Sequence, residues 1–198
     1  MRDAATACIL VAAALWSGPV SAQDAWVGLS IGGVSARFDG PATVDFTQRT
    51  GWTIGVFADV ESPVRPLDIR VEGRWSRRGG DETRGGGGAE SDVLALPLAI
   101  GPRFHLGRLA LYPFLGLEVA YPLATRRSTD LEVGFAEPAR TEVGGFAGAA
   151  LDFAWPGRLR FGLEGRWLRG FNPAFEGSAG RLNLRTAELT LRISRPVN

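Results

Sequence analysis

The stretch from Ser91 to Leu123, SDVLALPLAIGPRFHLGRLALYPFLGLEVAYPL, contains two runs in which every second residue is apolar, separated by a predicted turn at His105–Arg108. Because successive side chains of a β-strand point to opposite faces, this pattern predicts a hairpin of two long strands with one continuous apolar face. The residues of that face are Leu94, Leu96, Leu98, Ile100, Pro102, Phe104, Leu109, Leu111, Pro113, Leu115, Leu117, Val119, Tyr121 and Leu123.

Both runs are longer than most strands of soluble domains. Such strands have about 5–6 residues, whereas about 9–11 tilted residues are needed to cross the hydrocarbon layer of a bilayer. A helix is excluded because Pro97, Pro102, Pro113 and Pro122 would each interrupt it. The hairpin is therefore predicted to span a membrane.

The same alternation marks six further strands, which makes eight in all. Their apolar faces cover residues 27–33, 52–60, 67–75, 143–155, 159–167 and 187–193. The connections between strands alternate in length, with short ones at 61–66, 105–108 and 156–157. This alternation is typical of outer-membrane barrels, which have long external loops and tight periplasmic turns. The predicted long loops are 38–49, 77–90, 124–140 and 170–180, and the charged, glycine-rich loop 77–90 is expected to be mobile and exposed to water.

The predicted fold is all-β, an eight-stranded antiparallel up-and-down transmembrane β-barrel. Alternation alone also fits a soluble lipocalin-like barrel with an apolar cup. Two features favour the membrane barrel: the face opposite the apolar one is rich in glycine and alanine, which suit a narrow interior, and the apolar face carries aromatic residues near both ends of the strands. These two predicted aromatic girdles are Trp52, Trp75, Tyr121 and Trp167 on the loop side, and Phe104, Phe153, Trp155 and Phe161 on the turn side.

In this orientation the lumen receives many charged side chains. Buried charges persist when they are paired and hydrogen-bonded, so we expect an interlocked network of ion pairs. Such a network is either a selectivity filter or a plug, and the small bore of an eight-stranded barrel favours the plug. The predicted network consists of Asp59, Asp68, Arg70, Glu72, Arg74, Arg103, Glu118, Asp152, Arg160, Glu164, Arg166, Glu188 and Arg192.

The first residues have the features of a cleaved secretory signal. Residues 1–22 combine Arg2, an apolar core from Ile9 to Trp16 and a small-residue cleavage site, so the barrel domain is expected to occupy residues 23–198. The one cysteine, Cys8, lies in this segment. No later stretch is apolar enough for a transmembrane helix, and the formal net charge of +1 gives no bias toward nucleic acid.

Catalytic chemistry has little support in the sequence. The single histidine, His105, falls at a predicted periplasmic turn rather than at the external rim, and no cluster of histidine or cysteine suits a metal. We therefore expect no enzyme activity, no metal and no cofactor.

Several short motifs resemble the PorT-like family of outer-membrane β-barrel proteins, which is akin to the OmpX and OmpA type of small barrel. These motifs are Leu96-Pro97-Leu98, Tyr112 to Gly116 with Tyr121-Pro122-Leu123, Gly144 to Gly148, and Leu163 to Trp167 followed by Gly170-Phe171-Asn172. The resemblance implies a protein of a Gram-negative outer membrane that contacts its lipid and is inserted by the barrel-assembly machinery.

The resulting hypothesis is a monomeric barrel with a charged, largely closed lumen and a structural or recognition role, in which the four long loops contact any extracellular partner. A small-solute pore through the same barrel is one alternative. A soluble periplasmic ligand-binding barrel is the other.

Overall fold

The structure is a computed structural model that describes residues 25–39, 46–62, 66–82, 88–127, 137–138, 140–156, 158–177 and 180–197. The predicted signal segment 1–22 lies outside these residues. No helix long and apolar enough to cross a membrane occurs in the described part of the chain.

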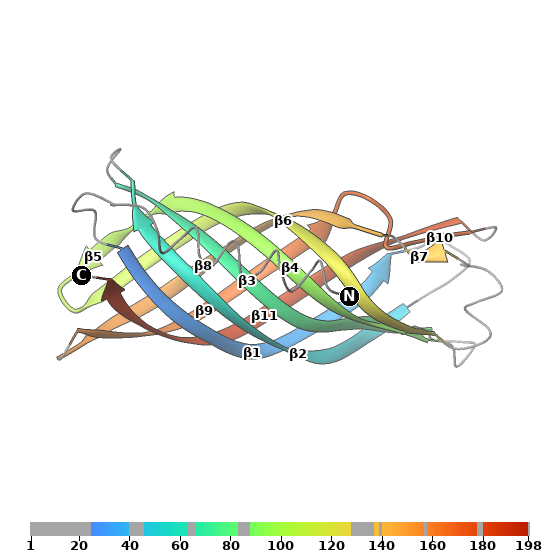
Figure 1. Ribbon diagram of the computed structural model, residues 1–198, viewed down its shortest axis with the longest axis horizontal. Coiled ribbons are helices and arrows are strands. Elements are labelled where there is room, and N and C mark those ends of the chain that lie inside the picture. Colours follow the sequence, from blue (N-terminus) through green and yellow to red (C-terminus); the bar gives the residue numbers. More distant parts are fainter. Residues whose placement is uncertain are drawn as a thin grey trace.

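Eight long strands and three short ones form one antiparallel sheet that winds into a cylinder (Figure 1). The predicted eight-stranded barrel is confirmed. The long strands are β1 (Ala25–Asp39), β2 (Phe46–Glu61), β3 (Leu67–Glu82), β4 (Gly88–Pro102), β6 (Leu109–Arg127), β8 (Glu142–Trp155), β9 (Leu159–Gly170) and β11 (Gly180–Val197), and the short ones are β5 (Phe104–Leu106), β7 (Glu137–Pro138) and β10 (Phe175–Gly177).

The barrel closes because the first and last strands pair with each other. β1 and β11 are antiparallel along their whole described overlap, from Ala25 opposite Val197 to Asp39 opposite Asn183. Closure pairs each of the eight long strands on both sides within the described residues, so none of them presents an edge to lipid, which would leave its backbone groups unpaired. Both described termini lie at one end of the barrel, together with β5 and the short turns, and β7 and β10 lie at the other (Figure 1). We call these ends the turn end and the loop end.

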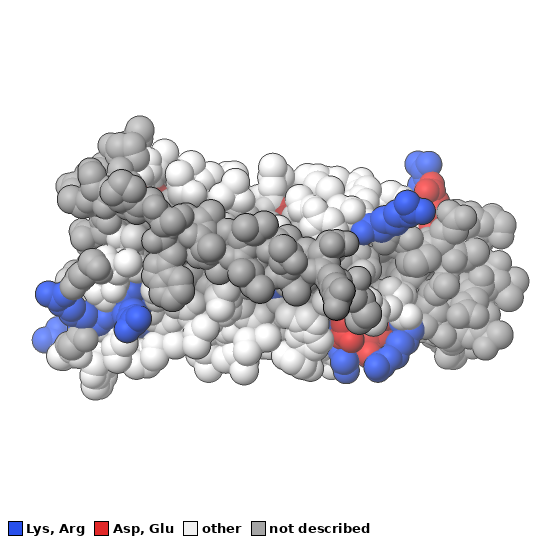
Figure 2. All heavy atoms as spheres, viewed as in Figure 1, with Lys and Arg blue, Asp and Glu red and all other residues white. Residues whose placement is uncertain are grey.

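The predicted apolar face points outward. Leu98 is 52% exposed and Leu115 is 64% exposed, whereas Arg70 on the opposite parity is 3% exposed. On the face shown in Figure 2, charged side chains gather near the two ends, and the described surface visible between them is almost entirely uncharged. An apolar belt between two charged ends fits a bilayer, and it rules out the soluble cup, whose apolar side chains would face inward.

Glycine in the inner wall makes room for phenylalanine from the neighbouring strand. Phe114 lies directly opposite Gly148, and Phe146 lies directly opposite Gly116. A Cβ atom added at Gly148 would lie 2.7 Å from the Phe114 ring and 2.4 Å from the Gly165 carbonyl oxygen. The glycines of the inner face therefore allow aromatic rings to lie flat against the wall of a narrow lumen.

The predicted loop boundaries are wrong, because the strands continue well into the predicted loops. The long loop 77–90 is strand up to Glu82 and again from Gly88, and Arg78 and Gly80 within it are buried rather than mobile. The other long connections, 38–49, 124–140 and 170–180, likewise contain strand residues of β1, β2, β6, β7, β10 and β11. The apolar pattern misses these extensions because beyond the outer aromatic residues the outward positions are charged. Similarly, the turn predicted at His105–Arg108 is reduced to Gly107-Arg108, with Gly107 at a φ of 67°.

The outward orientation of Leu98 predicts a large effect of a charge at this position. Leu98→Arg should destabilise the folded barrel by about 2–4 kcal/mol, because a guanidinium near the bilayer midplane is poorly solvated. Leu123→Arg, on the outward face of β6 two residues beyond Tyr121, should cost only about 0–1 kcal/mol. Urea unfolding in phospholipid vesicles measures both, and equal effects would contradict the assigned depth.

The tight contact at Gly148 predicts that a single methyl group disturbs the inner wall. Gly148→Ala should destabilise the protein by about 1–3 kcal/mol, because the new methyl would press on the Phe114 ring and a backbone carbonyl. Gly165→Ala is the matched control, since Gly165 faces outward and a Cβ there meets no atom within 4 Å. The same unfolding assay should show no loss for the control.

Candidate functional site

The barrel interior is the candidate site, because the predicted charged residues meet there. All thirteen side chains of the predicted network are buried. They project from β2, β3, β6, β8, β9 and β11, and Arg103 projects from the single residue between β4 and β5. Alternation along the strands sends them inward, so that charges far apart in sequence share one narrow space.

Asp59 is the centre of the network on the turn-end side. Its Oδ1 accepts from Arg70 Nε at 2.5 Å, and its Oδ2 lies 2.9 Å from Arg103, 3.1 Å from Arg160 and 3.3 Å from Arg192. Arg103 is in turn shared with two more carboxylates, those of Asp68 and, at 2.6 Å, Asp152. Three carboxylates therefore hold together four guanidiniums from opposite walls.

A second cluster lies toward the loop end. Glu72 Oε2 accepts from Arg74 at 2.6 Å and from Arg166 at 2.7 Å, and Glu188 pairs with both of these arginines. Glu164 connects the two clusters, because it accepts from Arg70 and Arg192 on one side and lies 2.9 Å from Arg166 on the other. The ion pairs thus form one continuous network along the barrel axis.

Arg78 also belongs to this network, although the sequence analysis did not predict it. Arg78 is 3% exposed and donates to Glu118 at 2.7 Å, although its position placed it in the predicted loop 77–90. The predicted set holds seven carboxylates and six guanidiniums, and Arg78 makes the numbers equal. Continuing the strict alternation of β3 past Trp75 would have assigned it to the lumen.

Aromatic rings fill the space between the charged groups. The Tyr112 ring lies under the guanidiniums of Arg70 and Arg103, each at 4.7 Å, and the Phe57 ring lies 4.2 Å from that of Arg192. Cation–π contacts of this kind stabilise guanidiniums that have lost their water. The charged lumen is therefore also a packed one.

An apolar cluster closes the lumen at the loop end. Phe38 from β1 packs edge-to-face on Phe175 from β10, with ring centroids 5.4 Å apart. Around them lie Ala36, Ala89, Ala174, Leu182 and Leu184. Because these side chains are buried and carry no polar group, this level of the barrel offers no path for an ion.

Two cavities lie among the described residues of the lumen, and both are small. One of about 10 Å³ adjoins Arg78, Glu118 and Glu142, and another, beside Arg70 and Phe114, has no room for a water molecule. A single water needs roughly 10–15 Å³ by this measure. Several atoms of the loop-end cluster, among them Arg78 Nη2 and Glu118 Oε2, lack hydrogen-bond partners in the described part of the chain. Some of the incompletely satisfied charges therefore lie beside the larger of these two cavities.

The histidine considered for catalysis lies away from the lumen. His105 is exposed on β5 at the turn end. The described residues contain no group of three or more histidine, cysteine or acidic side chains arranged to hold a metal ion.

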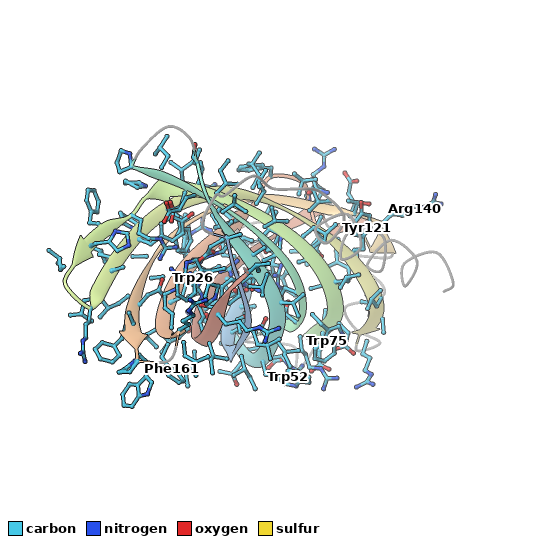
Figure 3. The ribbon with its side chains drawn as sticks, turned by 60° about the vertical axis from the view of Figure 1, so that its left-hand side comes forward. Trp26, Trp52, Trp75, Tyr121, Arg140 and Phe161 are labelled. Carbon is cyan, nitrogen blue, oxygen red and sulfur yellow. The ribbon has the colours of Figure 1, made fainter. Side chains whose placement is uncertain are left out.

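The residues of the two predicted aromatic girdles lie on the outside of the barrel. Trp52 and Trp75 are in ring contact at 4.1 Å, and they lie with Tyr121 toward one end in Figure 3, with Phe161 nearer the other end. Trp167 is also exposed near the loop end. At the turn end, Trp155 contacts Phe153 and Phe161, and Phe104 is exposed on β5, separated from them by β6.

The position of Asp59 predicts a large cost for removing its charge. Asp59→Asn should destabilise the barrel by about 3–5 kcal/mol, because four buried guanidiniums would lose their shared carboxylate. The control is Asp81→Asn, since Asp81 pairs with Arg49 at 3.0 Å on the half-exposed rim, where such a pair contributes about 0–1 kcal/mol. Chemical unfolding in vesicles compares the two, and similar effects would contradict the network.

Solved structures with similar folds are outer-membrane barrels. The outer membrane protein OprG of Pseudomonas aeruginosa aligns with a TM-score of 0.63 at 10% identity, over 89% of this chain and 97% of that one. Neisserial surface protein A aligns with a TM-score of 0.52 at 12% identity, over 87% and 97%. A major outer membrane protein of Thermus thermophilus aligns with a TM-score of 0.50 at 13% identity, over 86% and 99%. At these identities the likeness concerns the fold alone.

No curated protein sequence matches this chain. A family model does, and it is described as the outer membrane protein beta-barrel domain. The resemblance to the PorT-like group in particular stays a prediction. Because the match covers residues 7–192, nearly the whole chain, the protein belongs to the outer membrane protein beta-barrel domain family and is an integral protein of an outer membrane.

Proposed function

We propose that this protein is a non-conducting barrel that anchors a recognition surface in the outer membrane. The single observation that carries the proposal is the filled lumen: paired charges, aromatic rings and an apolar cluster follow one another along the axis. A barrel filled in this way serves as a support for its external connections and does not conduct solutes through its lumen.

The arrangement of the charges argues against a pore. A selectivity filter needs a water-filled path whose constriction has one dominant sign of charge. Here guanidiniums and carboxylates pair at 2.5–3.3 Å around Asp59, and both signs of charge are present along the network. An ion moving along the axis would have to break several of these pairs, each of which is buried and strongly held.

The loop end supports a recognition role. The strands continue beyond the outer aromatic residues, and the Phe38–Phe175 cluster gives this extension a core of its own. Such an extension holds the strand ends that flank the connections within 38–49, 77–90, 124–140 and 170–180 outside the bilayer. In this proposal those connections contact an extracellular partner, because loops positioned by a rigid scaffold are the usual recognition elements.

Export and insertion complete the proposal. Residues 1–22 would direct the chain across the inner membrane of a Gram-negative cell and be removed, leaving residues 23–198. The barrel-assembly machinery would then insert the domain as a monomer, since a closed barrel leaves no strand edge for a second copy.

Conductance in planar lipid bilayers tests the closed lumen. The parent protein should insert without stepwise current. A porin reconstituted in the same bilayers is the positive control, and its stepwise current demonstrates that the assay detects a water-filled path. Steady, ion-selective openings of the parent protein would overturn the proposal in favour of a pore.

A further inference from the structure

The outward surface near the loop end carries two groups of arginine that differ in their partners. The first group lies on β2, β3, β4 and β6, and its three arginines face three carboxylates. Arg49 pairs with Glu90 at 2.8 Å and Asp81 at 3.0 Å, Arg77 pairs with Asp92 at 2.8 Å, and Arg126 lies 3.7 Å from Glu90. This side of the rim is electrically compensated.

The second group forms a row across three neighbouring strands. Arg169 on β9 is directly opposite Arg185 on β11, and Arg185 is directly opposite Arg37 on β1. All three point outward, because the residue before Arg169 and Arg185 and the residue after Arg37 are buried inside the barrel. We call these three residues the arginine row.

The arginine row is not compensated within the described part of the chain. Asp39 is its one carboxylate partner there, paired with Arg185 and lying 3.7 Å from Arg37, and no ion pair is formed by Arg169. Like charges directly opposite each other in a sheet are destabilising. Three guanidiniums with one carboxylate therefore leave an excess of two positive charges, which favours an anion at this place.

The arginine row lies at the level where lipid headgroups are expected. Arg169 follows the exposed Trp167 by two residues on the same face of β9, and a step of two residues along a strand is about 7 Å. Tryptophan marks the membrane interface, so the next outward row falls among the headgroups. Below it the lipid-facing surface continues through Leu163 and Leu189.

We propose that the arginine row binds the phosphate of an anionic lipid headgroup in the outer leaflet. Guanidinium groups form paired hydrogen bonds to phosphate oxygens. Adjacent strands about 4.7–4.9 Å apart bring the Cα atoms of the three arginines within about 10 Å of one another, so their long side chains can reach one headgroup. The lipid is favoured over a soluble phosphate compound because the row adjoins the apolar belt, where the acyl chains of the same molecule would lie. Gly145 on β8 is directly opposite Arg169, and the exposed Phe171 lies beside Gly145. Phe171 therefore adds an apolar contact for the lipid at this level.

Quenching of tryptophan fluorescence by brominated lipids tests the proposal, because Trp167 reports on lipid next to the row. In phosphatidylcholine vesicles, brominated phosphatidylglycerol should compete for this site about tenfold better than brominated phosphatidylcholine. The excess quenching should vanish in W167F and persist in W75F. The triple variant R37Q/R169Q/R185Q should lose the preference for phosphatidylglycerol.

The matched control is R195Q, which removes an exposed outward arginine at the turn end of the same strand β11. It should keep the full preference. If the triple variant does not fold, as judged by its heat-modifiable migration on a denaturing gel, the single variant R185Q at the centre of the row replaces it and should lose part of the preference. An unchanged preference in the row variants, an equal loss in R195Q, excess quenching that survives W167F, or displacement by free glycerol phosphate would each overturn lipid binding by the row.

Discussion

Lipid around the barrel is the constraint on which the rest of the structure depends. Hydrocarbon offers no hydrogen bonds to the backbone and no solvation to charges, so the sheet has to close and every polar side chain has to turn inward. The pairing of β1 with β11 satisfies the first demand. The second explains why a narrow lumen holds so many charged groups, and why nearly all of them lie within reach of an opposite charge.

The ion pairs connect strands that are not neighbours in the sheet. Backbone hydrogen bonds join each strand only to its neighbours, whereas Arg70 on β3 pairs with Glu164 on β9, and Arg74 on β3 pairs with Glu188 on β11. Buried ion pairs contribute little net stability compared with apolar packing, but they discriminate strongly against wrong arrangements. A register shift of one residue would turn these arginines into lipid, so the network selects one register for strands that are far apart in the sheet.

Strand alternation was enough to predict the number of strands, the lipid-facing side and the inward charges, because all three follow from parity. It could not predict features set by neighbouring strands. The contact of Phe114 with Gly148 depends on the register between β6 and β8, and no local pattern encodes that register. Arg78 was missed for a different reason: the sequence rule equated the end of apolar alternation with the end of the strand.

The continuation of the strands beyond the apolar alternation shows where the barrel surface leaves the lipid. Beyond Trp75 and Tyr121 the strands persist with charged Arg77 and Asp92 outside. Past the Arg78–Glu118 pair the interior becomes apolar, with Phe38 and Phe175 inside. A sheet with an apolar interior and a charged exterior is the arrangement of a soluble protein. The aromatic residues thus mark a boundary between two solvents within single strands.

The rim on the outer side of that boundary carries charges that need opposite charges nearby. On the β3 side, carboxylates supply them. Along β9, β11 and β1 the described carboxylates do not balance the arginines. Water and salt could screen such an excess, but the arginine row lies next to the headgroups, where a lipid phosphate is the nearest counter-charge.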